Sequence, residues 1–90
     1  RILDVRTPRE FRGGHIPEAE NFDIADPQFP MWVQRLSRED SYYVYCSSGA
    51  RSLTACQLLA TLGFDSVFNL RNGLIGWEGE IERDDEGDLG

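Results

Sequence analysis

At residues 44–52 the chain reads Val44-Tyr45-Cys46-Ser47-Ser48-Gly49-Ala50-Arg51-Ser52. An apolar run ends at the cysteine, small polar residues follow, and a helical pattern then begins. This order directs several backbone N–H groups and a helix N-terminus at one sulfur atom, an arrangement that stabilises a thiolate, a persulfide or a bound oxyanion. A free cysteine is also commonly an ordinary buried strand residue. The stretch alone therefore leaves both interpretations open.

The residues around Cys46 suit an anionic nucleophile. An unperturbed thiol has a pKa of about 8.5, and a helix N-terminus, backbone amides or a nearby cation lower it. Arg51 supplies a permanent charge on a planar fork that matches oxyanions, and Gly49 lets the backbone curl toward the sulfur. The hydroxyl groups that could donate to an added sulfur or a bound oxyanion are those of Ser47, Ser48 and Ser52.

Other polar residues are better explained by structural roles. Ser52 is as well suited to cap the following helix as to contact the sulfur. Sulfur transfer demands no acid–base partner, because the leaving group departs as an anion. His15, the single histidine, is far from Cys46 in sequence, and a scaffold role at the Gly14–Pro17 turn is favoured over a catalytic one. Asp4 and Arg6 form a candidate structural ion pair at a strand end near the loop.

Apolar and alternating stretches predict strands on both sides of this loop. Tyr42–Tyr45 is rich in aromatic and β-branched residues, so it is predicted to be a central strand. The other predicted strands are Ile2–Val5, a brief one at Asn21–Ile24 and one centred on Val67-Phe68.

Helix signals alternate with these strands. Thr7 can cap a short helix in which Pro8 takes the first position and Glu10 completes a capping box. Further helices are predicted at Pro30–Leu36, after the loop, and at Leu74–Trp77 beyond the Asn72-Gly73 turn. The helix after the loop carries an apolar stripe of Leu53, Cys56, Leu59 and Ala60, and Cys56 is interpreted as a core residue.

The alternation of strands and helices predicts an α/β fold, with a mostly parallel central sheet flanked by helices on both faces. In such sheets ligands gather at the carboxyl ends of the strands. Cys46 directly follows a predicted central strand and precedes a helix, so the sequence order places it where a site is expected.

Composition narrows the class of protein. The chain has 90 residues, 40% hydrophobic and 28% charged, which fits one ordinary globular domain. No apolar run approaches the roughly 20 residues of a membrane span, and no basic face suggests nucleic acid. Two separated cysteines and one histidine favour neither a disulfide framework nor a metal site. A reducing, cytoplasmic setting fits best.

Acidic residues concentrate at the end of the chain. Residues 78–88 hold seven acids against Arg83, which accounts for −6 of the net charge of −7. We therefore expect a domain over residues 1–77 and an acidic, solvated and frayed tail over 78–90. The chain opens inside an apolar run at Ile2-Leu3, so we expect it to be part of a longer protein.

Three ordered segments resemble the rhodanese (thiosulfate sulfurtransferase) homology domain, of the single-domain type. Leu3–Pro8 with Glu10-Phe11 and Gly14–Ala19 resembles the first signature of that family, and Val44–Ser52 resembles its active-site loop. The closing pattern is matched by Gly63-Phe64, Val67, Leu70, Gly73 and Trp77. Glu18 departs from the family's usual small residue and Asn72 from a common glycine, both at turns. Such domains usually carry a further strand and helix before the Asp4 strand.

The resemblance implies a sulfurtransferase that moves sulfane sulfur through a Cys46 persulfide. The donor would be thiosulfate or a persulfide, and the acceptor a thiol, cyanide or a protein, with no cofactor beyond the covalent persulfide. Ser47, Ser48, Gly49, Ala50 and Arg51 would form the anion cradle, with Arg51 orienting the donor. Asp4, Arg6, His15 and Ser52 would give structural support.

Loop length separates the alternatives within this resemblance. Six residues run from Cys46 to Arg51, the length that goes with sulfur chemistry in this family, whereas the related cell-cycle phosphatases have a longer loop. A phosphatase-like or arsenate-reductase-like enzyme is the enzymatic alternative. A non-catalytic regulatory or interaction module is the other, and the intact Cys46 and Arg51 count against it.

Overall fold

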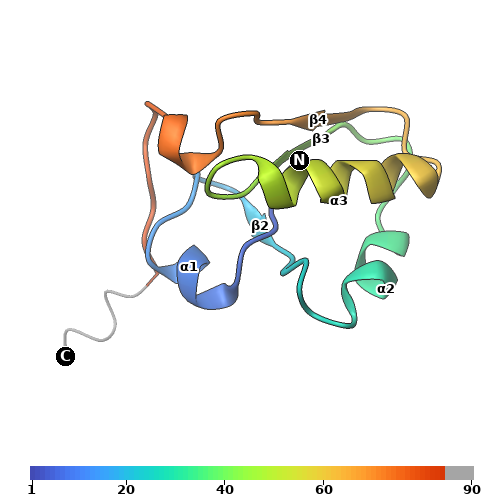
Figure 1. Cartoon of the computed structure of the whole chain (residues 1–90), viewed down its shortest axis with the longest axis horizontal. Coiled ribbons are helices and arrows are strands. Elements are labelled where there is room, and N and C mark those ends of the chain that lie inside the picture. The colour runs from blue at the N-terminus through green and yellow to red at the C-terminus, as the bar shows by residue number, and fades with distance from the viewer. Residues whose placement is uncertain (85–90) are drawn as a thin grey trace.

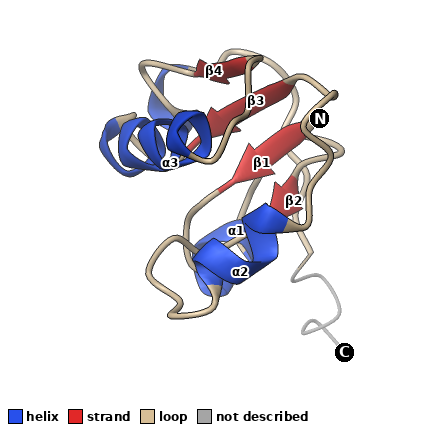
Figure 2. Ribbon diagram, turned by 90° about the vertical axis from the view of Figure 1, so that its right-hand side faces the viewer, coloured by secondary structure: helices blue, strands red, loops and turns tan. Residues whose placement is uncertain are grey.

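The fold is a four-stranded parallel sheet with helices, seen in a computed structural model that describes residues 1–84. The strand order is β2-β1-β3-β4, and every neighbouring pair runs parallel (Figure 2). Their bounds are Ile2–Asp4 for β1, Glu20–Asn21 for β2, Tyr42–Tyr45 for β3 and Val67–Asn69 for β4. The predicted parallel α/β fold is confirmed, and Tyr42–Tyr45 is a central strand as expected.

Three helices connect successive strands, and a short 3₁₀ helix follows the last strand (Figure 1). They are α1 at Pro8–Arg12, α2 at Phe29–Gln34, α3 at Ala50–Thr61 and the short 3₁₀ helix η1 at Leu74–Gly76. The capping box predicted for α1 is present, because the Thr7 hydroxyl accepts from Glu10 N–H while the Glu10 carboxylate accepts from Thr7 N–H. The brief strand expected at Asn21–Ile24 begins one residue earlier and ends at Asn21.

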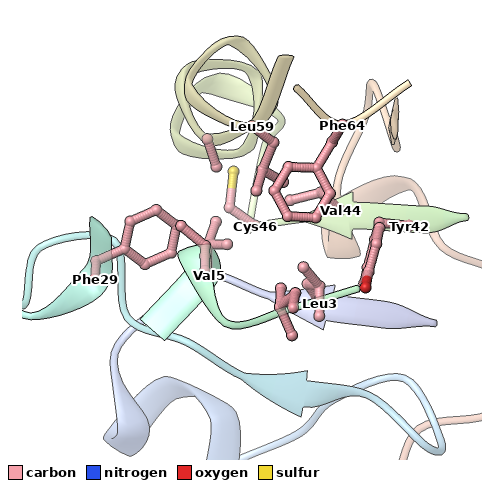
Figure 3. Packing of buried hydrophobic residues seen from close by; sticks show 11 residues of the cluster. Leu3, Val5, Phe29, Tyr42, Val44, Cys46, Leu59 and Phe64 are labelled. Carbon is pink, nitrogen blue, oxygen red and sulfur yellow. The ribbon is translucent and has the colours of Figure 1, made fainter. Parts of the chain in front are cut away.

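The hydrophobic core lies on one face of the sheet (Figure 3). Strand side chains alternate between faces, so Leu3 and Val5 of the first strand segment share this face with Val44 and Cys46. The helix residues that complete the core are Phe29 and Val33 of α2 and Ala55 and Leu59 of α3.

The opposite face of the sheet is partly open to solvent. Tyr43 and Phe68 are stacked on one another there and are about half exposed, at 54% and 50%. They line an apolar groove of about 420 Å³ that also contains Ile2, Tyr45 and Trp77. Within residues 1–84, α2 and α3 both contribute side chains to the core face.

The apolar stripe predicted on α3 is right for Leu59 and Cys56 and wrong for Leu53 and Ala60. Leu53 is 50% exposed and Ala60 is also exposed, while Ser52, Ala55 and Leu59 are the helix residues that face the core. A polar residue takes an inward position because its hydroxyl is satisfied there by the loop and by β4. Cys56 is partly buried against the core, in line with its interpretation as a packing residue.

The beginning of the predicted frayed tail is held to the domain. Backbone hydrogen bonds of 2.8 Å join His15 and Glu82 in both directions, and Asp84 N–H donates to Arg12 C=O. The domain boundary at residue 77 stays a prediction, and residues 85–90 of the tail lie outside the described residues. Within residues 1–84, no helix is long and apolar enough to span a bilayer.

Glu18 occupies the turn position where the resemblance predicts a small residue. Its φ of +70° lies in the left-handed region that side chains other than glycine rarely adopt. Such a backbone conformation costs about 1 kcal/mol for an ordinary residue. The departure therefore carries a local cost in the turn before β2, away from the Cys46 loop.

Candidate active site

Cys46 lies immediately after β3, at the carboxyl end of the sheet where a site was expected. Its side chain is 1% exposed. The Sγ atom accepts hydrogen bonds from the backbone N–H of Gly49 at 3.1 Å and of Ser52 at 3.4 Å, and Ser52 Oγ lies 3.5 Å away. The loop therefore wraps donors around the sulfur as its sequence predicts.

These donors alter the acidity of the thiol. Burial by itself raises the pKa of Cys46, because desolvation penalises the charged sulfur. Hydrogen bonds from the Ser52 hydroxyl and from the backbone N–H groups of Ser52, Gly49 and Ser48 outweigh burial, so the pKa lies below its ordinary value. Cys56 shows the contrast, because burial without such donors raises its pKa to about 11. Of the two cysteines, Cys46 is therefore the one whose pKa is shifted toward the thiolate form.

Gly49 makes the curl of the loop possible. Its φ is +103°, and a Cβ placed on it would lie 1.9 Å from the carbonyl oxygen of Arg71. Only glycine adopts this backbone conformation at no steric cost and leaves room for so close a neighbour. The Gly49 N–H that reaches Sγ therefore depends on the missing side chain.

The segment after β4 fixes the outer side of the loop. Leu74 N–H donates to Cys46 C=O at 2.8 Å and Ile75 N–H donates to Ser47 C=O at 3.0 Å. Gly73, with φ of +61°, brings this segment in, since a Cβ there would lie 2.4 Å from Ser47 O. With these loop carbonyls bound by η1, the N–H groups of the following loop residues are left to face the sulfur.

Ser52 does not cap α3, contrary to one of the two roles considered for it. The N-terminal capping position is occupied by Gly49, and Ser52 lies inside the helix, fully buried. Its Oγ donates to Gly49 C=O at 3.2 Å or to Asn69 Oδ1, and Asn69 Nδ2 also donates to Gly49 C=O. Asn69, at the end of β4, thus positions a hydroxyl beside Sγ.

We expect Ser52→Ala to raise the pKa of Cys46. The variant loses the hydroxyl that lies 3.5 Å from Sγ and can turn its hydrogen toward the thiolate, while it keeps the Ser52 backbone N–H. The pH profile of iodoacetamide alkylation, followed at Cys46 by mass spectrometry, should shift to higher pH. Thr54→Ala is the matched control, since its hydroxyl lies on the exposed side of the same helix. Superimposable profiles for Ser52→Ala and wild type would contradict the role of this hydroxyl.

Arg51, the last residue of the loop, forms an ion pair with Glu10 of α1. Arg51 Nη1 donates to Glu10 Oε1 at 2.9 Å and Nη2 donates to Oε2 at 3.0 Å. Ser47 Oγ joins the pair, 3.3 Å from Arg51 Nη2 and 3.4 Å from Glu10 Oε2. The hydrogen bond from Arg51 lowers the pKa of Glu10 to about 2, so Glu10 stays ionised at neutral pH.

The remaining predicted cradle residues contribute mainly backbone. Ser48 and Ala50 have exposed side chains, and the Ser48 N–H is among the donors that favour the Cys46 thiolate. Ala50 is the first residue of α3, so it continues the chain from the curl at Gly49 into the helix.

Asp4 and Arg6 form the predicted ion pair below the loop. Both are nearly fully buried, and Arg6 Nη2 lies 2.6 Å from Asp4 Oδ2 and 2.6 Å from the Gly14 carbonyl oxygen. The arginine also lies over the ring of Tyr45. The pair joins the end of β1 to the glycine turn that precedes His15.

His15 is buried away from the sulfur contacts. Its ring stacks on Phe11 with centroids 3.8 Å apart, Nδ1 lies 3.0 Å from Ile16 C=O, and Nε2 lies 3.1 Å from Asp84 Oδ2. These contacts join the turn to α1 and to the early part of the tail.

Two residues of this site were missed from sequence. Glu10 was recognised only as part of a capping box, although the same carboxylate reaches Arg51, 41 positions along the chain. The sequence did not mark Asn69 as a site residue, because asparagine is common in the turns that follow strands. The register of β4 beside β3 could have suggested it, since Asn69 pairs with Val44 just before the loop.

Comparisons with known proteins agree with this fold. Residues 1–80 match the family model of the rhodanese-like domain. The crystal structure of a rhodanese-like domain protein from Staphylococcus aureus matches with a TM-score of 0.81 at 28% identity, covering 92% of this chain and 79% of that chain. The chain belongs to the rhodanese-like domain family.

Two of the relatives are named as sulfurtransferases. A sulfurtransferase of Allochromatium vinosum is 37% identical over 76 residues, which cover 84% of this chain and 69% of the relative. A putative mitochondrial thiosulfate sulfurtransferase of Schizosaccharomyces pombe is 30% identical over 92 residues, which cover 90% and 65%. The chain therefore spans about two thirds of the length of these relatives, and the family to which it belongs includes proteins named as sulfurtransferases.

Proposed function

We propose that this domain transfers sulfane sulfur from thiosulfate or a persulfide donor to a thiol or cyanide acceptor, through a persulfide on Cys46. The observation that carries the proposal is the set of backbone N–H groups around Sγ, with Gly49 N–H at 3.1 Å and Ser52 N–H at 3.4 Å. Such a cradle favours a sulfur anion both before and after a second sulfur is added.

In the first step the Cys46 thiolate attacks the outer sulfur of thiosulfate. A new S–S bond forms on Cys46 while the S–S bond of the donor breaks, and sulfite leaves with the electron pair. The product is a persulfide whose outer sulfur carries the negative charge. No proton has to move, which agrees with a site in which His15 makes its contacts with Phe11, Ile16 and Asp84.

In the second step an acceptor thiolate or cyanide attacks the outer sulfur of the persulfide. The S–S bond to Cys46 breaks, and the electron pair returns to the cysteine as its thiolate. The acceptor leaves as a persulfide or as thiocyanate. Stabilisation of the Cys46 thiolate by Ser52 and Gly49 makes it a better leaving group in this step. A protein thiol could serve as the acceptor.

The sequence also supports sulfur over phosphate as the substrate. The six residues from Cys46 to Arg51 are the length that goes with sulfur chemistry in rhodanese domains, so a phosphatase-like or arsenate-reductase-like activity is the alternative. Persulfide chemistry requires reduced thiols, and both cysteines of the chain are free. We therefore propose a reducing, cytoplasmic setting and no cofactor beyond the covalent persulfide.

The direct test is intact-mass spectrometry after incubation with thiosulfate. We expect one added sulfur, located at Cys46 by peptide mapping and removed by cyanide. Cys56→Ser should gain the same sulfur, because burial raises the pKa of Cys56 to about 11 and leaves it protonated at neutral pH. An added sulfur on Cys56, or no added sulfur together with turnover of a phosphate ester, would contradict the proposal.

A further inference from the structure

The guanidinium fork that a sulfur donor would use is already occupied. Both Nη atoms of Arg51 bind Glu10, at 2.9 and 3.0 Å, and Nη2 also contacts Ser47 Oγ. A two-point pair of this kind is the geometry with which arginine recognises carboxylates and oxyanions. A small oxyanion can obtain the same two contacts only by displacing the Glu10 carboxylate.

Glu10 is held in place by more than Arg51. Its Oε1 accepts from Thr7 N–H at 3.0 Å and from the Thr7 hydroxyl at 3.2 Å, so the carboxylate also closes the capping box of α1. Its carboxylate stays ionised throughout the neutral range with or without the Arg51 pair, because an unperturbed glutamate has a pKa of about 4.3. Movement of Arg51 toward a donor would thus leave a fixed negative charge beside that donor.

The cavity next to this pair has mixed charge. Glu10 lines a hollow of about 380 Å³ together with Arg9, Arg83 and Leu74, and the Leu74 N–H donates to Cys46 C=O. The arginines attract anions in general, whereas Glu10 is the acid among the lining residues and lies against the loop. Glu10 is therefore the lining residue that would repel a donor according to its negative charge.

We propose that Glu10 is a specificity-determining residue that masks Arg51 and selects against doubly charged sulfur donors. The inference rests on the proposed sulfur transfer and names the donor class within it. Donors with fewer charges, such as thiosulfonates or persulfides of organic thiols, need the Arg51 fork less and meet less repulsion. The Cys46 thiolate remains the nucleophile for every donor.

The test compares thiosulfate, a dianion, with methanethiosulfonate, a monoanion whose S–S bond breaks in the same way to release methanesulfinate. Glu10→Gln keeps the capping box, because glutamine also serves at that position, and it removes the negative charge. We expect the KM for thiosulfate to fall about threefold to tenfold, with a smaller change for methanethiosulfonate. The ratio of kcat/KM for thiosulfate to that for methanethiosulfonate should rise accordingly.

Further variants test the Glu10–Arg51 pair itself. Glu20→Gln disrupts a second bidentate glutamate–arginine pair, with Arg1, far from the loop, and should leave the donor ratio unchanged. Arg51→Ala should raise the KM for thiosulfate. Glu10→Gln added to it should shift the donor ratio less than Glu10→Gln alone, because repulsion by the carboxylate is relieved but no guanidinium is uncovered. Glu10→Ala is tested in parallel, so that the result does not depend on one folded variant.

The outcomes separate this inference from the proposed function. An unchanged or lower donor ratio in Glu10→Gln and Glu10→Ala, with normal sulfur transfer by the wild type, would overturn the role of Glu10 alone. An equal shift of the ratio by Glu10→Gln with and without Arg51 would overturn it as well. Absence of an added sulfur on Cys46 of the wild type would instead remove the proposed function.

Discussion

Cys46→Ser is expected to reduce sulfur transfer from thiosulfate to cyanide by at least about a thousandfold, since loss of the nucleophile removes the covalent path itself. A serine hydroxyl at this site is not ionised at neutral pH and forms no persulfide. The fold should be retained, because the substitution exchanges one small buried side chain for another within reach of the same N–H donors. Thiocyanate formation and the midpoint of urea unfolding measure the two effects.

Cys56→Ser is the matched control for this experiment. It changes the other cysteine of the chain, which is partly buried on α3. Within residues 1–84, Cys56 is not among the hydrogen-bond partners of Cys46 Sγ. Its turnover should stay close to that of the wild type. Substantial turnover by Cys46→Ser would show that another group carries the sulfur and would overturn the mechanism.

Gly49→Ala should have the second largest effect, on both stability and activity. A methyl group at this position would lie 1.9 Å from Arg71 O, and the φ of +103° is itself unfavourable for alanine. Backbone strain and overpacking together should lower the free energy of unfolding by about 3 kcal/mol or more. Relief of the clash would also move the Gly49 N–H away from Cys46 Sγ.

Gly63→Ala separates the cost of the backbone conformation from the cost of the steric clash. Gly63 has a similar φ of +96°, but nothing lies within 4 Å of the position that its Cβ would take. We expect a loss of about 1 kcal/mol from the backbone conformation alone, with sulfur transfer unaffected. Urea unfolding of the two variants measures the difference, and equal losses at both positions would show that contact with Arg71 is unimportant.

Much of this architecture could be predicted because its causes are local in sequence. The capping box of α1 needs only residues that lie three positions apart, and Tyr42–Tyr45 is recognisable as a strand from its own side chains. The loop after Cys46 was predictable for the same reason, since a curl of glycine and small residues before a helix places N–H groups around the preceding side chain.

What sequence could not provide depends on contacts between distant segments. Glu10 meets Arg51 from 41 residues away and Asn69 meets Ser52 from 17 residues away. The phase of α3 follows from the second of these contacts, because a buried Ser52 rotates Leu53 toward solvent despite its apolar side chain. A pattern based on hydrophobicity assigns the opposite orientation to both residues.

The N–H groups of Leu74 and Ile75 in η1 bind the carbonyls of Cys46 and Ser47, so the pKa of Cys46 depends on a segment that follows the last strand. The loop is complete only after β4 has paired beside β3 and Gly73 has brought η1 into contact. The pKa of Cys46 should therefore fall only when residues 73–76 dock against the loop during folding. Pulsed alkylation during refolding would time the docking of the C-terminal segment without any attached dye.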